Sequence, residues 1–518
     1  MVSVSSTVTT LAAARAWWLW SLAYVIVSVA LFNTYYIDDA FIHARYAKHL
    51  AEGFGFVFNP GDPTSYGTSS PLYTMALAFA VRLVPDPLLA AKGIGLLCGA
   101  AAIAMFHRML RHGAASHAAS AGLVVGAMLL WVSNVTLLRW SNSGMETSLW
   151  VLLQVVSFDC ALRAGVTGRL ALYAAAGACA GAGVLTRPEG AVWALAIVLI
   201  AFLAGRRTTP PRHRSWSGML VMAAVACVLL APWTIYAISA FGSIVPNTVL
   251  AKGAARPLFD TPVVEYGRAF LVNAGDASLP VILPLGAAVL MIMVSAPRLM
   301  WGRLSPHVAA GLVFPILLFS GYWAANGAVS SRYLCIFFVP SLWLWTVLTT
   351  ELAREASAPS VARSMVGWSC VWALVSAAAM GAVAVPQARR HAASNDRVRD
   401  MGRWIAAHTN PAARVAAVDI GVIGYESNRY IVDVAGLATR DVIPHVVAGT
   451  VFQYLQIKPP DYLWIRDLML DDTVPPDARP ILIPIRTLVY DSFSLLDRTS
   501  DRYVLYRMDW TRLPGGLP

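Results

Sequence analysis

Long apolar runs alternate with short polar segments over the first three quarters of the chain. Runs that could cross about 30 Å of hydrocarbon lie at roughly 17–34, 88–108, 118–138, 145–163, 170–186, 190–204, 216–240, 279–297, 308–325, 333–352 and 364–386. This pattern predicts about eleven transmembrane helices within a membrane domain spanning residues 1–386. The apolar run 71–84 is shorter, begins at Pro71 and contains Arg82, which is typical of an interfacial helix.

The basic residues between these runs predict how the helices are oriented. We expect the N-terminus to be cytoplasmic and 71–84 not to cross. The loops at 107–112, 163–169, 206–214, 297–303 and 354–363 then all lie inside, as the positive-inside rule requires. If 71–84 crossed, all of them would face outward. The preferred arrangement places a large loop, 35–70, and the other polar, sequence-rich loops together on the extracytoplasmic side.

Composition changes after residue 386, where polar residues and proline become frequent and no further span follows. A helical pattern covers 395–408, and short apolar runs at 414–419, 429–434, 462–466, 480–484 and 503–506 are typical of strands. The sequence therefore predicts a soluble α/β domain over 387–518, on the extracytoplasmic side.

Overall composition agrees with a polytopic α-helical membrane protein. Of the 518 residues, 58% are hydrophobic and only 13% are charged, against about 25% charged in soluble domains. The net charge of +11 comes largely from the short loops and does not indicate binding to nucleic acid. All six cysteines lie in or beside apolar runs, so neither a disulfide framework nor a zinc site is indicated.

The sequence lacks common motifs for binding nucleotides and for hydrolysis, which restricts the reactions that the protein could catalyse. The sequence has no Walker loop, no dinucleotide fingerprint, no nucleophile elbow and no zinc-protease helix. An activated donor that reaches an extracytoplasmic site would most simply be lipid-linked. A sugar on a polyprenyl phosphate needs a base for the acceptor hydroxyl and cations for the leaving phosphate.

Candidate residues for both tasks lie at the outer ends of the predicted spans. Asp38 or Asp39 could act as the base; alternatively, the pair simply begins a helix, with Asp38 as N-cap. Arg187, Arg332 and Lys252 could bind the phosphate, although Arg187 and Arg332 could equally well snorkel at the membrane surface.

Several short motifs resemble one family. The first outer loop reads Asp38-Asp39-Ala-Phe-Ile-x-x-Arg45-Tyr46, then Gly53-x-Gly55-x-Val57-x-Asn59-x-Gly61 and Thr68-Ser69-Ser70-Pro71-Leu72. Later come Ser143-Gly-Met-Glu-Thr147, Thr186-Arg-Pro-Glu-Gly190, Pro246-Asn-Thr248, Arg332-Tyr-Leu334 and Asp419-x-Gly-x-Ile-Gly-Tyr425. Together they resemble the C-type (GT-C) polyprenyl-phosphate-sugar-dependent membrane glycosyltransferases, most closely the terminal arabinofuranosyltransferases.

The resemblance implies an inverting enzyme of the bacterial plasma membrane that moves a pentose, D-arabinofuranose, to a cell-envelope glycan or glycolipid. One of the two aspartates would be the base. Substrate contacts are expected from the remaining motif residues: His43, Arg45, Tyr46, Thr68, Ser69, Glu146, Glu189 and Asn247. No metal site is predicted, and a divalent cation is left open. A protein glycosyltransferase of the same fold and a lipid-linked sugar flippase are the alternative functions.

Overall fold

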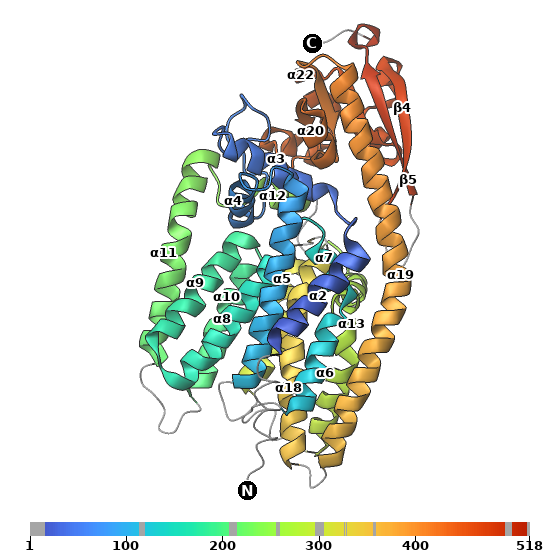
Figure 1. Ribbon diagram of the computed structural model, residues 1–518. Coiled ribbons are helices and arrows are strands. Elements are labelled where there is room, and N and C mark those ends of the chain that lie inside the picture. Colours follow the sequence, from blue (N-terminus) through green and yellow to red (C-terminus); the bar gives the residue numbers. More distant parts are fainter. Residues whose placement is uncertain are drawn as a thin grey trace.

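A computed structural model describes residues 16–112, 120–206, 215–254, 260–295, 305–325, 327, 329–355, 359–492 and 500–514. A bundle of apolar helices forms most of the molecule, and a small α/β domain lies at one end of it (Figure 1). The bundle contains, in chain order, α2 Trp17–Phe32, α5 Pro87–His112, α6 Ala121–Val132, α7 Val135–Ser141, α8 Thr147–Thr167, α9 Leu170–Thr186, α10 Gly190–Gly205, α11 Ser215–Phe241, α13 Val263–Ser295, α15 Ser305–Val308, the π-helical turn Ala309–Val313, α16 Phe314–Ala324, α17 Ser331–Leu334, the 3-10 turn Cys335–Phe337, α18 Phe338–Glu355 and α19 Pro359–His408.

Each predicted apolar run coincides with a helix, which confirms the fold class. Within the described ranges, six helices are long and apolar enough to cross a membrane, or eight if each of two bent pairs forms one span. Shorter apolar helices include α2, α9 and α10. The total of about eleven spans stays a prediction. The predicted cytoplasmic loops at 206–214 and 297–303 lie largely or wholly outside the described residues, whereas 354–363 is described except for residues 356–358.

Two predicted segments are more bent or more ordered than expected. The apolar run 118–138 is broken by 57° between α6 and α7, where the Asn134 side chain accepts the N–H of Leu137 and starts a new helix. The predicted loop 241–279 is partly helical, because it contains α12 Asn247–Ala254 and the first half of α13. Helix α13 then turns by 101° after Asp276.

The predicted outer loop 35–70 contains helix α3 Asp38–Ala51, and the predicted interfacial segment forms α4 Pro71–Ala80. Ten residues of helix extend only about 15 Å, too short to cross a bilayer. Tyr73 and Leu77 on α4 are buried, so part of this helix is covered by protein. Its position at the membrane surface stays a prediction.

The C-terminal domain is built on a five-stranded sheet, and each of its strands overlaps a predicted one, although the predicted strand 480–484 shares only residues 482–484 with β4. The strands are β1 Arg414–Ala417, β2 Tyr430–Asp433, β3 Tyr462–Arg466, β4 Leu482–Asp491 and β5 Ser500–Met508. Their order is β2-β1-β3-β5-β4. Strands β2, β1 and β3 are parallel, and β5 is antiparallel to both of its neighbours, β3 and β4. Short helices α20 Gly421–Ser427, α21 Ile443–Ala448, α22 Val451–Ile457 and α23 Leu470–Thr473 complete the domain.

One helix and one shared core join the two parts. Two separate helices were expected near 364–386 and 395–408, but α19 runs through both without a break (Figure 1). The change of composition near residue 387 therefore falls within a continuous helix. Phe41 and Ile42 of α3 belong to the same hydrophobic cluster as Val415 and Ile423 of the C-terminal domain, so this domain is docked directly on α3.

Candidate active site

A cavity of 430 Å³ lies where the helix bundle, α3 and the C-terminal domain meet. Its walls come from segments far apart in sequence, including α3, the turn before α8, the turn between α9 and α10, and helices α12, α16 and α17. The polar residues of the lining are Asp39, His43, Ser69, Glu146, Arg187, Glu189, Thr248, Tyr322, Arg332 and Tyr333. Segments that the sequence predicted to share one side therefore meet in one place; which side of the membrane this is stays a prediction.

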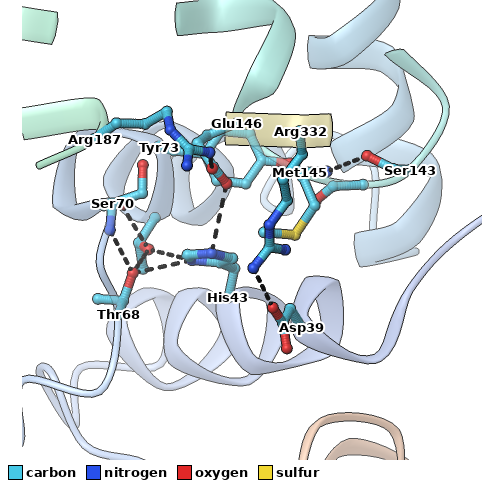
Figure 2. Close-up of polar contacts among 12 residues, drawn as sticks. Asp39, His43, Thr68, Ser70, Tyr73, Ser143, Met145, Glu146, Arg187 and Arg332 are labelled. Atoms are coloured by element: carbon cyan, nitrogen blue, oxygen red, sulfur yellow. Dashed lines mark hydrogen bonds and ion pairs between the residues drawn. The ribbon is translucent and has the colours of Figure 1, made fainter. Parts of the chain in front are cut away.

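The two adjacent aspartates have different partners. Asp39 lines the cavity, and its Oδ2 atom accepts a hydrogen bond from Arg332 Nη2 at 2.8 Å (Figure 2). Asp38 instead accepts the backbone N–H groups of Gly421 at 3.0 Å and Val422 at 2.8 Å, at the start of α20. Of the two, Asp39 is therefore the one placed to meet a substrate.

Asp38 fastens α3 to the C-terminal domain. A Cβ at Gly421 would lie 2.1 Å from the backbone oxygen of Asp38, so only glycine permits this close approach. Burial, together with the negative charge of Asp419, raises the pKa of Asp38 to about 7, although the two N–H donors oppose the shift. The alternative for the pair holds in part. The two aspartates do begin α3, but the N-cap of this helix is Ile37, and the predicted N-cap role of Asp38 is wrong because its carboxylate binds the start of α20 instead.

Two arginines flank one tyrosine ring in the cavity. The Arg187 and Arg332 guanidinium carbons lie 4.7 Å and 4.8 Å from the Tyr333 ring centroid, within cation–π range. Arg332 Nη2 also donates to the Tyr333 hydroxyl at 2.8 Å. Each guanidinium is therefore held in place by packing and by charge, which snorkelling alone would not require.

Arg187 is committed to two carboxylates. Its Nη2 and Nε atoms donate to Glu189 at 3.0 and 3.3 Å. Its Nη1 atom pairs with Glu146, as Figure 2 shows. Burial acts to raise the pKa of Glu189, but the Arg187 guanidinium outweighs it and holds that pKa below its usual range. With the described residues, Arg332 makes its two hydrogen bonds through a single atom, Nη2. It therefore commits fewer of its five donors than Arg187 and is the better candidate for binding phosphate.

His43 faces the cavity one turn after Asp39. Its Nδ1 atom lies 2.9 Å from Thr68 Oγ1 and 3.1 Å from Thr74 Oγ1, while Nε2 lies 3.8 Å from Glu146 Oε2 (Figure 2). Burial lowers the pKa of His43, and the Glu146 carboxylate opposes this, so the ring is neutral near pH 7. Glu146 Oε2 accepts no hydrogen bond from the described residues, and a substrate hydroxyl would fit its chemistry.

Some predicted substrate contacts lie elsewhere. Arg45 is buried outside the cavity lining and donates to backbone carbonyls of Phe58 and Arg429, so its role is to join the outer loop to the C-terminal domain. Tyr46 is buried against Ser65. Thr68 supports His43 from behind, whereas its neighbour Ser69 reaches the lining.

Helix α12 contributes to the cavity through residues that follow the predicted Asn247. Thr248 and Val249 line the cavity, while Asn247 itself is buried and donates its backbone N–H to Tyr66. Lys252 lies on the same helix, but its side chain falls outside what the structure describes.

Sequence reasoning missed several lining residues, among them Tyr322, Tyr333 and Leu437. Tyr333 lay within the Arg332 motif, and its aromatic ring beside an arginine was a usable signal. Tyr322, which donates to Glu189, and Leu437 of the C-terminal domain sit in apolar or loop sequence without a local signal. Among the described residues, no group of three or more His, Cys, Asp or Glu side chains could hold a metal ion.

The fold can be compared with known proteins. No curated protein matches by sequence, and residues 387–508 match a family described as a domain of unknown function (DUF8728). The structure is similar to ArnT from Cupriavidus metallidurans bound to undecaprenyl phosphate, with a TM-score of 0.58 and 13% identity over 94% of this chain and 97% of that chain.

Two further structures are similar over most of this chain. One is the archaeal oligosaccharyltransferase AglB from Archaeoglobus fulgidus in complex with an inhibitory peptide and a dolichol-phosphate, with a TM-score of 0.53 and 13% identity over 88% of this chain and 70% of that chain. The other is the arabinofuranosyltransferase AftD from Mycobacteria, with a TM-score of 0.52 and 14% identity over 95% of this chain and 41% of that chain. The chain has the GT-C fold of membrane glycosyltransferases.

Proposed function

We propose that this protein is an inverting membrane glycosyltransferase that moves a sugar from a polyprenyl phosphate to a hydroxyl of a cell-envelope glycan or glycolipid. The observation that carries the proposal is the placement of Asp39 and Arg332 side by side in one cavity, where α3 meets the membrane helices. A carboxylate and a guanidinium supply the two functions that this transfer needs.

In the proposed reaction, the acceptor oxygen attacks the anomeric carbon as the bond from that carbon to the phosphate oxygen breaks. Asp39 takes the acceptor proton, and the polyprenyl phosphate leaves with the electron pair. The contact with Arg332 holds the Asp39 carboxylate in place before the reaction. The positive charge of Arg332 then stabilises the negative charge that develops on the leaving phosphate.

The walls of the cavity suit a lipid-linked donor. Val192 of α10 and Leu318 of α16 contribute apolar surface beside the charged residues, so a polyprenyl chain could lie toward the bundle while its phosphate meets Arg332. The undecaprenyl phosphate bound to ArnT and the dolichol-phosphate bound to AglB support a donor of this class here.

For the sugar, we propose D-arabinofuranose, which rests on the resemblance of the outer-loop motifs to terminal arabinofuranosyltransferases. The site and the C-terminal domain would then be extracytoplasmic at the bacterial plasma membrane. This assignment follows the distribution of basic loops.

The direct test is incubation of the purified, reconstituted protein with radiolabelled polyprenyl-phosphoryl-arabinose and extracted cell-envelope acceptors. We expect label to appear in the glycan or glycolipid fraction with inverted anomeric configuration. Parallel reactions with EDTA address the divalent cation. If label stays on the lipid with every acceptor, or if it crosses a vesicle membrane without transfer, the enzyme assignment is wrong.

A further inference from the structure

The C-terminal domain reaches the cavity through a turn that follows strand β2. Among the described lining residues, Leu437 is the one that this domain supplies. It lies in the turn formed by residues 433–439, and its side chain is partly exposed. An apolar side chain from a separate domain therefore completes a cavity whose other walls belong to the membrane domain.

The shape of the 433–439 turn is set by one buried carboxylate. Asp433 is fully buried and accepts the backbone N–H groups of four turn residues, Ala435, Gly436, Ala438 and Thr439, at 2.9, 3.0, 2.7 and 3.0 Å. Gly436 adopts a φ of +77°, which a side chain would strain. The turn that carries Leu437 is thus held in one conformation.

Contacts with the membrane domain hold this turn against the cavity. Strand β2 is an edge strand, and the Asn59 side chain pairs with both backbone groups of Ile431 at 2.9 and 3.0 Å, as a neighbouring strand would. A Cβ at Gly67, itself a lining residue, would lie 2.8 Å from the Cα of Ala438. The backbone of the turn therefore touches the outer loop beside the cavity.

The side from which each substrate enters the cavity suggests which of the two Leu437 contacts. A lipid-linked donor keeps its polyprenyl chain in the bilayer and must enter from the helix bundle. The C-terminal domain lies at the end of the bundle, beyond α3 (Figure 1), so the wall that it supplies faces the substrate that arrives from water. Sugar rings present C–H faces that pack on apolar side chains.

We propose that Leu437 is a specificity-determining residue for the acceptor, and that it packs against the C–H face of the sugar unit whose hydroxyl is modified. This inference rests on the proposed glycosyltransferase function and adds a role for the C-terminal domain in substrate choice. Leu437 takes no part in proton transfer, so it should affect acceptor binding and leave the donor untouched.

The test compares the full-length variants Leu437→Ala and Leu437→Trp with a matched control, Val447→Ala, on α21 of the same domain, where the side chain is 52% exposed. Initial rates are measured against acceptor concentration at saturating donor, and against donor concentration at saturating acceptor. Removing apolar contacts from a specificity pocket changes discrimination by about tenfold or more. We expect Leu437→Ala to raise the KM for acceptor about tenfold without changing the KM for donor.

The other variants distinguish a change in acceptor specificity from a general loss of folding or activity. Leu437→Trp should reject branched acceptors more strongly than linear ones, and Val447→Ala should behave as the wild type. Unchanged acceptor KM and acceptor preference in both Leu437 variants, or an equal rise in both KM values, would overturn this inference while wild-type transfer still supported the proposed function. Absence of transfer by the wild type would overturn both.

Discussion

Asp39→Asn should reduce sugar transfer by about 10²–10⁴-fold, which is the range that a positioned general base contributes. Asp39 faces the cavity and lies 2.8 Å from Arg332. Asparagine has nearly the same size and can occupy the same place, but it cannot take up the acceptor proton. The remaining rate should reflect binding and stabilisation of the leaving phosphate.

Binding of the donor should survive this substitution. The polar lining contains three carboxylates, Asp39, Glu146 and Glu189, and two guanidiniums, Arg187 and Arg332. The donor phosphate is an anion, so removing one negative charge does not weaken its attraction to the cavity. We therefore expect kcat to fall while the KM for donor stays unchanged or decreases, which marks an interaction used in the transition state.

Asp38→Asn provides the matched control, because the chemical change is the same one residue earlier. The asparagine can accept one N–H from α20 but turns an amide donor toward the other, which should weaken docking by about 0.5–1.5 kcal/mol. Transfer by this variant should stay within tenfold of the wild type. The reasoning is refuted if Asp39→Asn keeps more than about a tenth of the wild-type rate, or if Asp38→Asn is the more damaging change.

Three further expectations concern phosphate binding, pH and topology. Arg332→Lys should raise the KM for donor roughly ten- to a hundredfold, since a charge-assisted contact contributes about 1.5–3 kcal/mol; wild-type kinetics would return Arg332 to a snorkelling role. The pKa of Asp38 at about 7, against about 3.9 when unfolded, means that the folded chain retains a proton that the unfolded chain has lost. This stabilisation is complete below about pH 4 and is lost as pH rises through 7, so melting temperatures should fall between about pH 4 and 7 in the wild type and fall less in Asp38→Asn. A reporter that works only in the cytoplasm should stay silent when fused at Pro518, which lies outside the described residues; a signal there would overturn the predicted orientation.

Hydrophobic period and length were sufficient to predict the fold class. The apolar runs and the five short strands depend on local sequence, and each of these positions coincides with a helix or strand in the structure. What local pattern could not show was continuity and bending. Nothing in the composition near residue 387 distinguishes a linker from the unbroken α19. The 101° turn follows Asp276, which accepts hydrogen bonds from the Thr136 hydroxyl and forms an ion pair with Arg139, both on α7.

The candidate site was predictable as a set of segments but not as a set of contacts. His43, Glu146, Arg187, Glu189 and Arg332 all line the cavity, and the sequence had placed them on one side through the count of crossings. Which arginine commits to carboxylates depends on the distance between α8 and the turn after α9, which no local motif encodes. Leu437 lies more than a hundred residues after Arg332 in another domain, so only the tertiary fold brings it to the cavity.

Helical geometry explains why the two neighbouring aspartates, Asp38 and Asp39, have different roles. Successive residues on a helix are rotated by about 100°, so positions three and four apart share a face. Asp39 therefore shares a face with His43, which lines the cavity. Asp38 shares the other with Phe41, whose ring lies 5.5 Å from that of Tyr425 on α20. Because these two faces belong to one rigid helix, the contacts of Asp38 with α20 also determine the direction in which Asp39 points. Loosening the C-terminal domain should thus lower kcat through the position of the base, even though no residue of that domain takes the proton.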